Sequence, residues 1–189
     1  QRADRQLEFT QLDVEMSFVE REDVLDLAEG LYCRIWQEVL GVELPRPFPR
    51  MPHAEALLRF GSDKPDLRYG LEIADVSALV ADSGFGVFQG AVAAGGVVRA
   101  LACPGGAALS RKDLDELVEF AKEWGGKGLA YLLLDPSGEV RSPIAKFLSE
   151  DEVAGLREAT GAGPGDAVFI AADDAATVVR VLGALRPHL

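Results

Sequence analysis

The stretch that decides the fold is residues 110–134, SRKDLDELVEFAKEWGGKGLAYLLL. It begins with a capping box, in which Ser110 and Asp113 satisfy backbone N–H groups at the start of a helix. Gly125 and Gly126 end that helix, because glycine adopts the left-handed backbone that helix ends favour. The apolar run that follows predicts a strand at 129–134. The stretch therefore predicts a helix that leads into a strand.

The alternation of strands and helices continues on both sides of this stretch. Ser149 and Glu152 form a second capping box, which predicts a helix to about Thr160. The turn residues Pro136 and Gly138 predict a hairpin. The other predicted elements are strands near 85–88, 97–103, 140–146 and 167–172 and a last helix from Asp173 or Asp174 to Leu185. This pattern indicates an independent α+β domain over residues 85–184, with 185–189 as a segment that returns to the rest of the chain.

The first 84 residues have a different character. A helical stripe predicts a helix over residues 22–40 that stops at Gly41. Prolines at 45, 47, 49 and 52 exclude a central strand and predict an extended connector. A short helix that ends near Gly61 and a turn over 61–66 follow.

The opening stretch, QRADRQLEFTQLDVEMSF, predicts a strand with two chemically different faces. One face is apolar and is expected to join a core: Thr10, Leu12, Val14, Met16 and Phe18. The other face is mostly polar. Since alternate residues on a strand face lie about 7 Å apart, it forms a ladder of one aromatic ring, one amide and two carboxylates: Phe9, Gln11, Asp13 and Glu15.

The composition bounds the function. The chain has 189 residues, of which 48% are hydrophobic, and its net charge is −12. That charge repels a phosphate backbone, so any contact with RNA must be local. The basic side chains available are Arg2 and Arg5 in the opening loop and a second group, Arg46, Arg50, Arg59, Lys64 and Arg68. We expect the second group to be a solvated surface that forms ion pairs with acids such as Glu55, Asp63 and Asp66.

The chain has no apolar run of transmembrane length and no secretory signal pattern, which predicts a cytoplasmic protein without a membrane partner. Cys33 and Cys103 form no disulfide framework and no metal-binding spacing, and we expect both to be reduced, mostly buried thiols. His53 and His188 do not indicate a metal site.

The opening stretch resembles motif 2 of class II aminoacyl-tRNA synthetases, and most closely that of the bacterial-type aspartyl-tRNA synthetases. The resemblance continues in order along the chain, through PFPRM, FGSDKPDLRYGLE, DSGFGVF, PGGAALSRK, GGKGLAY, SPIAKFLS and LGALR. It implies an α+β chain in which residues 1–84 are part of a class II synthetase antiparallel-sheet core. Residues 85–184 would then be the GAD domain that is inserted into that core.

The family resemblance implies a function for the opening stretch. The parent would be an aspartate–tRNA ligase that activates L-aspartate with ATP and Mg²⁺ and transfers it to the acceptor end of tRNA. By matching position, Gln6 contacts ATP and Phe9 stacks on adenine. Arg2 and Arg5 would contact the tRNA or the phosphates. Gln11, Asp13 and Glu15 would lie toward the aspartate or Mg²⁺.

Purely structural roles for Phe9 and the carboxylates are the alternative. Phe9 would otherwise pack under a neighbouring strand, and the carboxylates would form a solvated strand face. The chain begins within motif 2 and stops before motif 3, so we interpret it as an internal fragment, inactive alone, of an enzyme expected to be a homodimer. The alternative is a non-catalytic GAD-type module that binds or scaffolds tRNA or protein. The sequence does not distinguish a ligase specific for aspartate tRNA from one that also charges asparagine tRNA.

Overall fold

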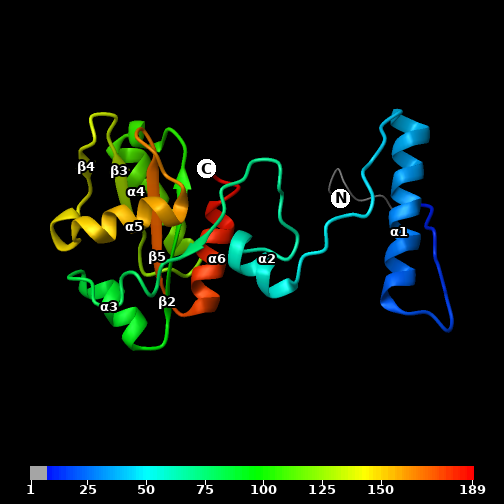
Figure 1. The fold of residues 1–189 in the computed structure, drawn as a ribbon, viewed down its shortest axis with the longest axis horizontal. Helices are drawn as coiled ribbons and strands as arrows, with labels where there is room; N and C mark the ends of the chain where they lie inside the picture. The colour runs from blue at the N-terminus through cyan, green and yellow to red at the C-terminus, as the bar shows by residue number, and fades with distance from the viewer. Residues whose placement is uncertain (1–7) are drawn as a thin grey trace. The chain divides into compact units, whose positions relative to one another are not determined.

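The computed structural model of the chain describes residues 8–189 (Figure 1). The chain forms two compact units, which divide after Arg50. This division differs from the boundary predicted near residue 85. Residues 51–84 belong to the same compact unit as the α+β domain that the sequence predicted over residues 85–184.

The first unit is built on one long helix. Helix α1 spans Arg21–Ile35 and continues as a π-helical turn over Trp36–Leu40. The N–H of Glu20 donates to Asp23 Oδ2 at 2.8 Å and caps the start of the helix. Gly41, with a φ of 67°, ends the helical stretch. The helix predicted over residues 22–40 is confirmed.

The predicted opening strand is wrong for the described residues. Residues 9–18 form no strand, and Phe18 adopts a positive φ of 56°. A strand needs a neighbour to satisfy its backbone groups, and the one sheet found in residues 8–189 lies in the second unit. Leu12 and Phe18, expected in a core, are 71% and 107% exposed.

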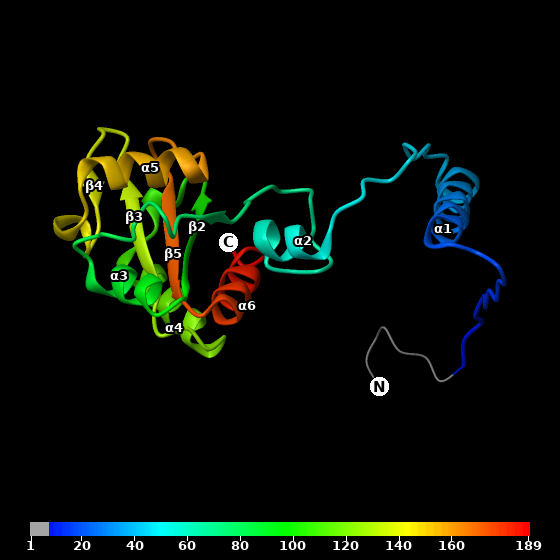
Figure 2. The same cartoon turned by 60° about the horizontal axis from the view of Figure 1, so that its bottom comes forward.

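The second unit contains a five-stranded antiparallel sheet with the strand order β1-β2-β5-β3-β4 (Figures 1 and 2). The strands are β1 (Ala74–Asp75), β2 (Val97–Cys103), β3 (Ala130–Leu134), β4 (Val140–Arg141) and β5 (Ala167–Asp173). The predicted strands at 97–103, 129–134 and 167–172 are confirmed. Strand β4 stops well before residue 146, because Pro143 has no N–H to give to a ladder. Strand β1 was not predicted.

Five helices complete the second unit: α2 (His53–Phe60), α3 (Gly86–Ala93), α4 (Arg111–Glu123), α5 (Glu150–Thr160) and α6 (Ala175–Leu185). Both predicted capping boxes are present, since Ser110 and Ser149 each accept a backbone hydrogen bond at 3.2 Å. The strand predicted at 85–88 is wrong. Those residues begin helix α3, because Phe88, Ala91 and Val92 recur at helical spacing and pack on the sheet.

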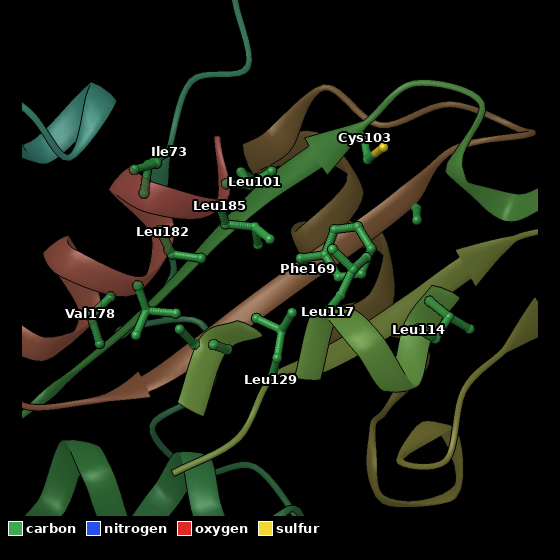
Figure 3. Packing of buried hydrophobic residues seen from close by; sticks show 14 of the residues in the cluster. Ile73, Leu101, Cys103, Leu114, Leu117, Leu129, Phe169, Val178, Leu182 and Leu185 are labelled. Atoms are coloured by element: carbon green, nitrogen blue, oxygen red, sulfur yellow. The ribbon is translucent and has the colours of Figure 1, made fainter. Parts of the chain in front are cut away.

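The sheet separates two apolar cores. On one face, Leu117 of α4 and Leu182 of α6 pack over Phe169 of β5 (Figure 3). On the other face, Phe88 of α3 and Leu156 of α5 pack over neighbouring strand residues such as Ile170. Because both faces of the sheet are buried, the central strands are nearly continuous apolar runs. The predicted α+β class is therefore confirmed for this unit as a mixed structure with an antiparallel sheet.

Residues before and after the predicted domain take part in the same cores. Ile73 lies in the first core, and Val76 and Val80 lie in the second. Helix α2 approaches α6 closely at Gly61 and Gly183, where a Cβ on Gly183 would come within 2.3 Å of the carbonyl oxygen of Gly61. Leu185 and Arg186, at the start of the segment 185–189, are also buried, while residues 187–189 are exposed.

Candidate functional site

The residues expected to bind ATP and aspartate lie in an exposed segment. Phe9 is 70% exposed, and Gln11, Asp13 and Glu15 are also exposed. Within the described part of the chain, no hydrogen bond or ion pair joins these four side chains. The structure thus leaves them accessible but does not assemble them into a site. Arg2, Arg5 and Gln6 lie outside the described residues.

The segment runs beside the apolar stripe of α1. Val14 and Met16, expected to point into a core, line a groove of about 370 Å³ with Leu27 and Leu31 of the helix. The stripe itself is largely open to solvent, with exposed side chains at Val24, Leu27, Leu31, Ile35, Val39 and Leu40. An apolar surface of this kind is typical of a face that packs against another protein segment.

A buried carboxylate joins α1 to the proline-rich connector. Glu29 is 3% exposed. Its carboxylate pairs with Arg50, accepts a hydrogen bond from the N–H of Phe48 at 3.1 Å and lies 3.6 Å from Arg46 Nε. Burial alone would raise the pKa of Glu29, but the hydrogen bond from Arg50, the Phe48 N–H and the charges of both arginines hold it below its usual value. Arg46 and Arg50 are therefore engaged in ion pairs.

Arg59 and Arg68 are also paired, in the second unit. Arg59 bridges Glu55 at 2.6 Å and Glu72 at 2.7 Å, and Arg68 pairs with Asp66. The hydrogen bond from Arg59 lowers the pKa of Glu72, and Arg68 lowers that of Asp66 to about 2. The ion-paired surface is thus confirmed for Arg46, Arg50, Arg59 and Arg68, with Glu55 and Asp66 among the partners as expected, but Lys64 and Asp63 form no ion pair in the described residues.

Arg186 holds the loop between α2 and β1 in place. Its side chain is 2% exposed and lies between two rings, 4.8 Å from the centroid of Phe60 and 4.5 Å from that of Tyr69. The guanidinium donates to the carbonyls of Gly70 and Leu71 at 3.0 Å and to that of Asp66 at 2.6 Å. Sequence reasoning missed this clamp, because the partners lie more than a hundred residues away and no local signal marks them.

The ion pairs predict how the second unit responds to acid. The pKa values of Asp66, Glu72 and Asp75 are all lowered in the folded chain. A lowered folded pKa stabilises the fold above the unfolded value of about 4 and loses that contribution as the pH falls through the folded value. The free energy of unfolding should therefore fall between about pH 4.5 and pH 2.

Urea unfolding at a series of pH values measures this dependence. The Glu72→Gln variant has no carboxylate to protonate at this position. The free energy of unfolding of the variant should therefore depend less steeply on pH than that of the unchanged chain. A Glu72→Gln profile parallel to the unchanged one would show that the Arg59 pair does not couple to folding.

The second unit contains a domain of a known family. A family model described as "GAD domain" matches residues 88–182, about half of the chain. The chain belongs to the GAD domain family. The match covers the four strands from β2 to β5, helices α4 and α5 and most of α3 and α6. The compact unit that contains the GAD domain extends further, from Met51 to Leu189.

Curated relatives match the chain beyond the GAD domain. An aspartate–tRNA(Asp/Asn) ligase of Symbiobacterium thermophilum is 54% identical over 188 residues, which is 100% of this chain and 32% of the relative. That of Moorella thermoacetica is 55% identical over 98% of the chain and 31% of its own length. An aspartate–tRNA ligase of Clostridium perfringens is 51% identical over 100% of the chain and 31% of its own length. The chain thus spans about a third of these relatives, and its resemblance to bacterial-type aspartyl-tRNA synthetases is confirmed.

Across residues 8–189, no three His, Cys, Asp or Glu side chains gather as a metal site. Both cysteines are free, with Cys103 buried and Cys33 partly buried, and burial raises the pKa of Cys103. No helix in that range is long and apolar enough to cross a membrane.

Proposed function

We propose that this chain is the part of an aspartate–tRNA ligase that contains the second half of motif 2, adjoining class II core and the inserted GAD domain. The observation that carries the proposal is identity of about half of all residues to such ligases along the entire chain. The activity proposed for the whole protein has two steps. The carboxylate of L-aspartate attacks the α-phosphate of ATP and expels pyrophosphate to give aspartyl-adenylate. The terminal ribose hydroxyl of tRNA then attacks the aspartyl carbonyl and releases AMP.

In this proposal the opening segment positions substrates. An aromatic ring stacks on a nucleobase only where its face is accessible, and the exposure of Phe9 supports such a role. Gln6 would contact ATP, while Arg2 and Arg5 would contact the tRNA acceptor end or the phosphates. The carboxylates of Asp13 and Glu15 would pair with the ammonium group of aspartate, and the amide of Gln11 would form a hydrogen bond with the substrate. Positioning and charge neutralisation supply most of the rate in reactions of this type.

The exposed apolar stripe of α1 supports the proposal that this chain packs against other parts of a larger protein. A helix that exposes six apolar side chains along one stripe has a surface suited to packing against other core elements. The whole ligase would be a cytoplasmic homodimer. Mg²⁺ prefers oxygen ligands, and the carboxylates of Asp13 and Glu15 are the oxygen donors that the opening segment would offer it.

A hybrid enzyme tests the proposal, with this chain in place of the matching third of the Symbiobacterium thermophilum ligase. Phe9→Ala in the hybrid should weaken ATP binding by roughly 1–3 kcal/mol, the value of a lost base stack. Asp13→Ala should chiefly raise the KM for aspartate. The measurement is the ATP and aspartate dependence of pyrophosphate exchange.

Phe18→Ala is the matched control, because Phe18 is an exposed aromatic residue of the same segment to which the proposal assigns no ligand. It should leave the KM for ATP unchanged. Equal effects of the two substitutions, or an unchanged KM for ATP in Phe9→Ala, would remove the stacking role and favour a packing role.

A further inference from the structure

The proline-rich connector has an alternating sequence. In residues 45–50, PRPFPR, each proline is followed by one other residue, which is Arg46, Phe48 or Arg50. Proline fixes its own φ and has no N–H, so this stretch is stiff and extended but cannot be held by a regular backbone ladder. Side chains must therefore hold it in place. We call residues 45–50 the strap.

All three of these residues meet one carboxylate, that of Glu29 on α1. Arg50 forms an ion pair with it, the N–H of Phe48 donates to it at 3.1 Å, and Arg46 Nε lies 3.6 Å away. Alternate residues of an extended chain face the same side, which explains how the three reach a single group. Glu29 is 3% exposed, and a buried carboxylate that loses a cationic partner is strongly destabilising. The strap and α1 therefore hold each other through Glu29.

The strap runs antiparallel to α1. Near its start, Arg46 Nη2 donates to the carbonyl of Asp26 at 3.3 Å. At its end, Arg50 Nη2 lies 3.6 Å from Glu22 Oε2, one turn earlier in the helix. The contacts thus extend along the length of the strap and are not confined to Glu29.

The strap lies on the side of α1 opposite to the exposed apolar stripe. Glu29 and Leu31 are two positions apart, which is about half a turn of a helix with about 3.6 residues per turn. A segment that packs on the apolar stripe would therefore leave the contacts of Glu29 in place.

One residue, Met51, separates the strap from helix α2. The two compact units divide after Arg50. Pro52 is already tied to α2, because it is the N-cap and its carbonyl accepts from the N–H of Ala56 at 3.0 Å. Within residues 8–189, the backbone N–H and carbonyl of Met51 form no hydrogen bond. A residue before proline is restricted to extended conformations, so Met51 has a narrow range of movement.

We propose that Glu29 locks the strap to α1, so that the hinge between the two compact units is Met51 and not the whole connector. A hinge needs only a few residues whose backbone angles change. Without the lock, the hinge would extend over residues 43–51 and the units would be joined by a loose tether. With the lock, the second unit turns as one body about the end of the strap. The lock depends on contacts within this chain and not on the proposed ligase activity.

NMR of the 189-residue chain tests the lock through amide hydrogen exchange and through relaxation of the backbone nitrogens. The N–H of Phe48 should exchange at least about tenfold more slowly than in an unfolded peptide of the same sequence, because it exchanges only when the lock opens. The amides of Arg46, Phe48 and Arg50 should share the rotational correlation time of α1. The amides from His53 onward should instead share that of the second unit.

Glu29→Ala should release the strap without melting the helix, since alanine has the highest helix propensity. The Phe48 amide should then exchange at least about tenfold faster than in the unchanged chain, and the strap amides should gain fast local motion. Glu29→Gln keeps an acceptor for the Phe48 N–H but no charge for the arginines, so its effect should be intermediate. Glu38→Ala is the matched control, because Glu38 belongs to the same helical stretch but pairs with Arg34 at 2.8 Å. It should leave the strap unchanged.

Three results would overturn the proposal. Exchange of the Phe48 amide in the unchanged chain at the rate of an unfolded peptide would show that the strap is not locked. Correlation times that change gradually over residues 43–51 would make the whole connector the hinge. Equal exchange rates of Phe48 in the Glu29→Ala and Glu38→Ala variants would show that the strap does not depend on Glu29.

Discussion

A chain that begins at Phe85 is expected not to fold, whereas one that begins at Met51 should unfold in a single cooperative transition. The shorter chain lacks Ile73, Val76 and Val80, which are 4%, 3% and 0% exposed in the two cores. Burial of each such side chain is worth roughly 1.5–3 kcal/mol. Their combined loss is comparable to the whole stability of a typical domain, about 5–15 kcal/mol.

The truncation also removes polar partners of the sheet. Strand β1 covers the edge of β2, where the N–H of Val76 donates to the carbonyl of Val98 at 2.9 Å. The hydroxyl of Ser77 accepts from the N–H of Val98 at 2.9 Å. Without these residues the edge of a central, apolar strand is left unpaired.

Circular dichroism during urea unfolding measures the outcome for chains 51–189, 85–189 and 1–189. The first and third should share the transition of the second unit, and the chain from Phe85 should show none. A cooperative transition of equal midpoint in the chain from Phe85 would establish that the domain is autonomous within the boundary predicted from the sequence.

Replacement of the buried arginine should produce the second-largest effect. Arg186→Ala removes the donor that serves the carbonyls of Asp66, Gly70 and Leu71 and empties the space between the rings of Phe60 and Tyr69. Hydrogen bonds from a charged donor are worth about 1.5–3 kcal/mol, and buried acceptors left without a donor add to the cost. We expect a loss of about 3 kcal/mol in the free energy of unfolding of chain 51–189.

Two variants separate the clamp from a general effect of lost charge. Arg186→Lys keeps the charge but not the planar fork, and its loss should be intermediate. Arg180→Ala removes another arginine of α6, whose bond to Thr177 Oγ1 at 2.8 Å links residues on the same helix. It should cost less than about 1 kcal/mol. Equal losses for Arg186→Ala and Arg180→Ala would show that the clamp does not hold the loop.

Elements set by local chemistry were predictable from the sequence, and those set by distant partners were not. The capping boxes at Ser110 and Ser149 mark helix starts within one turn, and the apolar run 167–172 is long enough to indicate β5. Strand β1 has two residues and exists only because β2 lies beside it. Helix α3 was taken for a strand because a short apolar run fits both periods.

The candidate site was likewise predictable only in part. The polar face at Phe9, Gln11, Asp13 and Glu15 followed from a two-residue period, but that period implies a strand only where another strand pairs with it. In the described residues no such neighbour exists, so the segment forms no regular secondary structure and is exposed. The roles of these residues came from family resemblance, and they remain proposals. The Arg186 clamp could not be predicted from the sequence, because only the folded chain brings Arg186 to its partners.

The central claim, that this chain is a working part of an aspartate–tRNA ligase, is tested most directly by pyrophosphate exchange in the Symbiobacterium thermophilum hybrid. The hybrid should exchange labelled pyrophosphate into ATP when L-aspartate is present and not when L-asparagine or L-glutamate replaces it. The isolated 189-residue chain should show none, because Phe9, Gln11, Asp13 and Glu15 are not assembled into a site in it. A hybrid that folds and binds ATP but has no aspartate-dependent exchange would contradict the account, and so would exchange by the isolated chain.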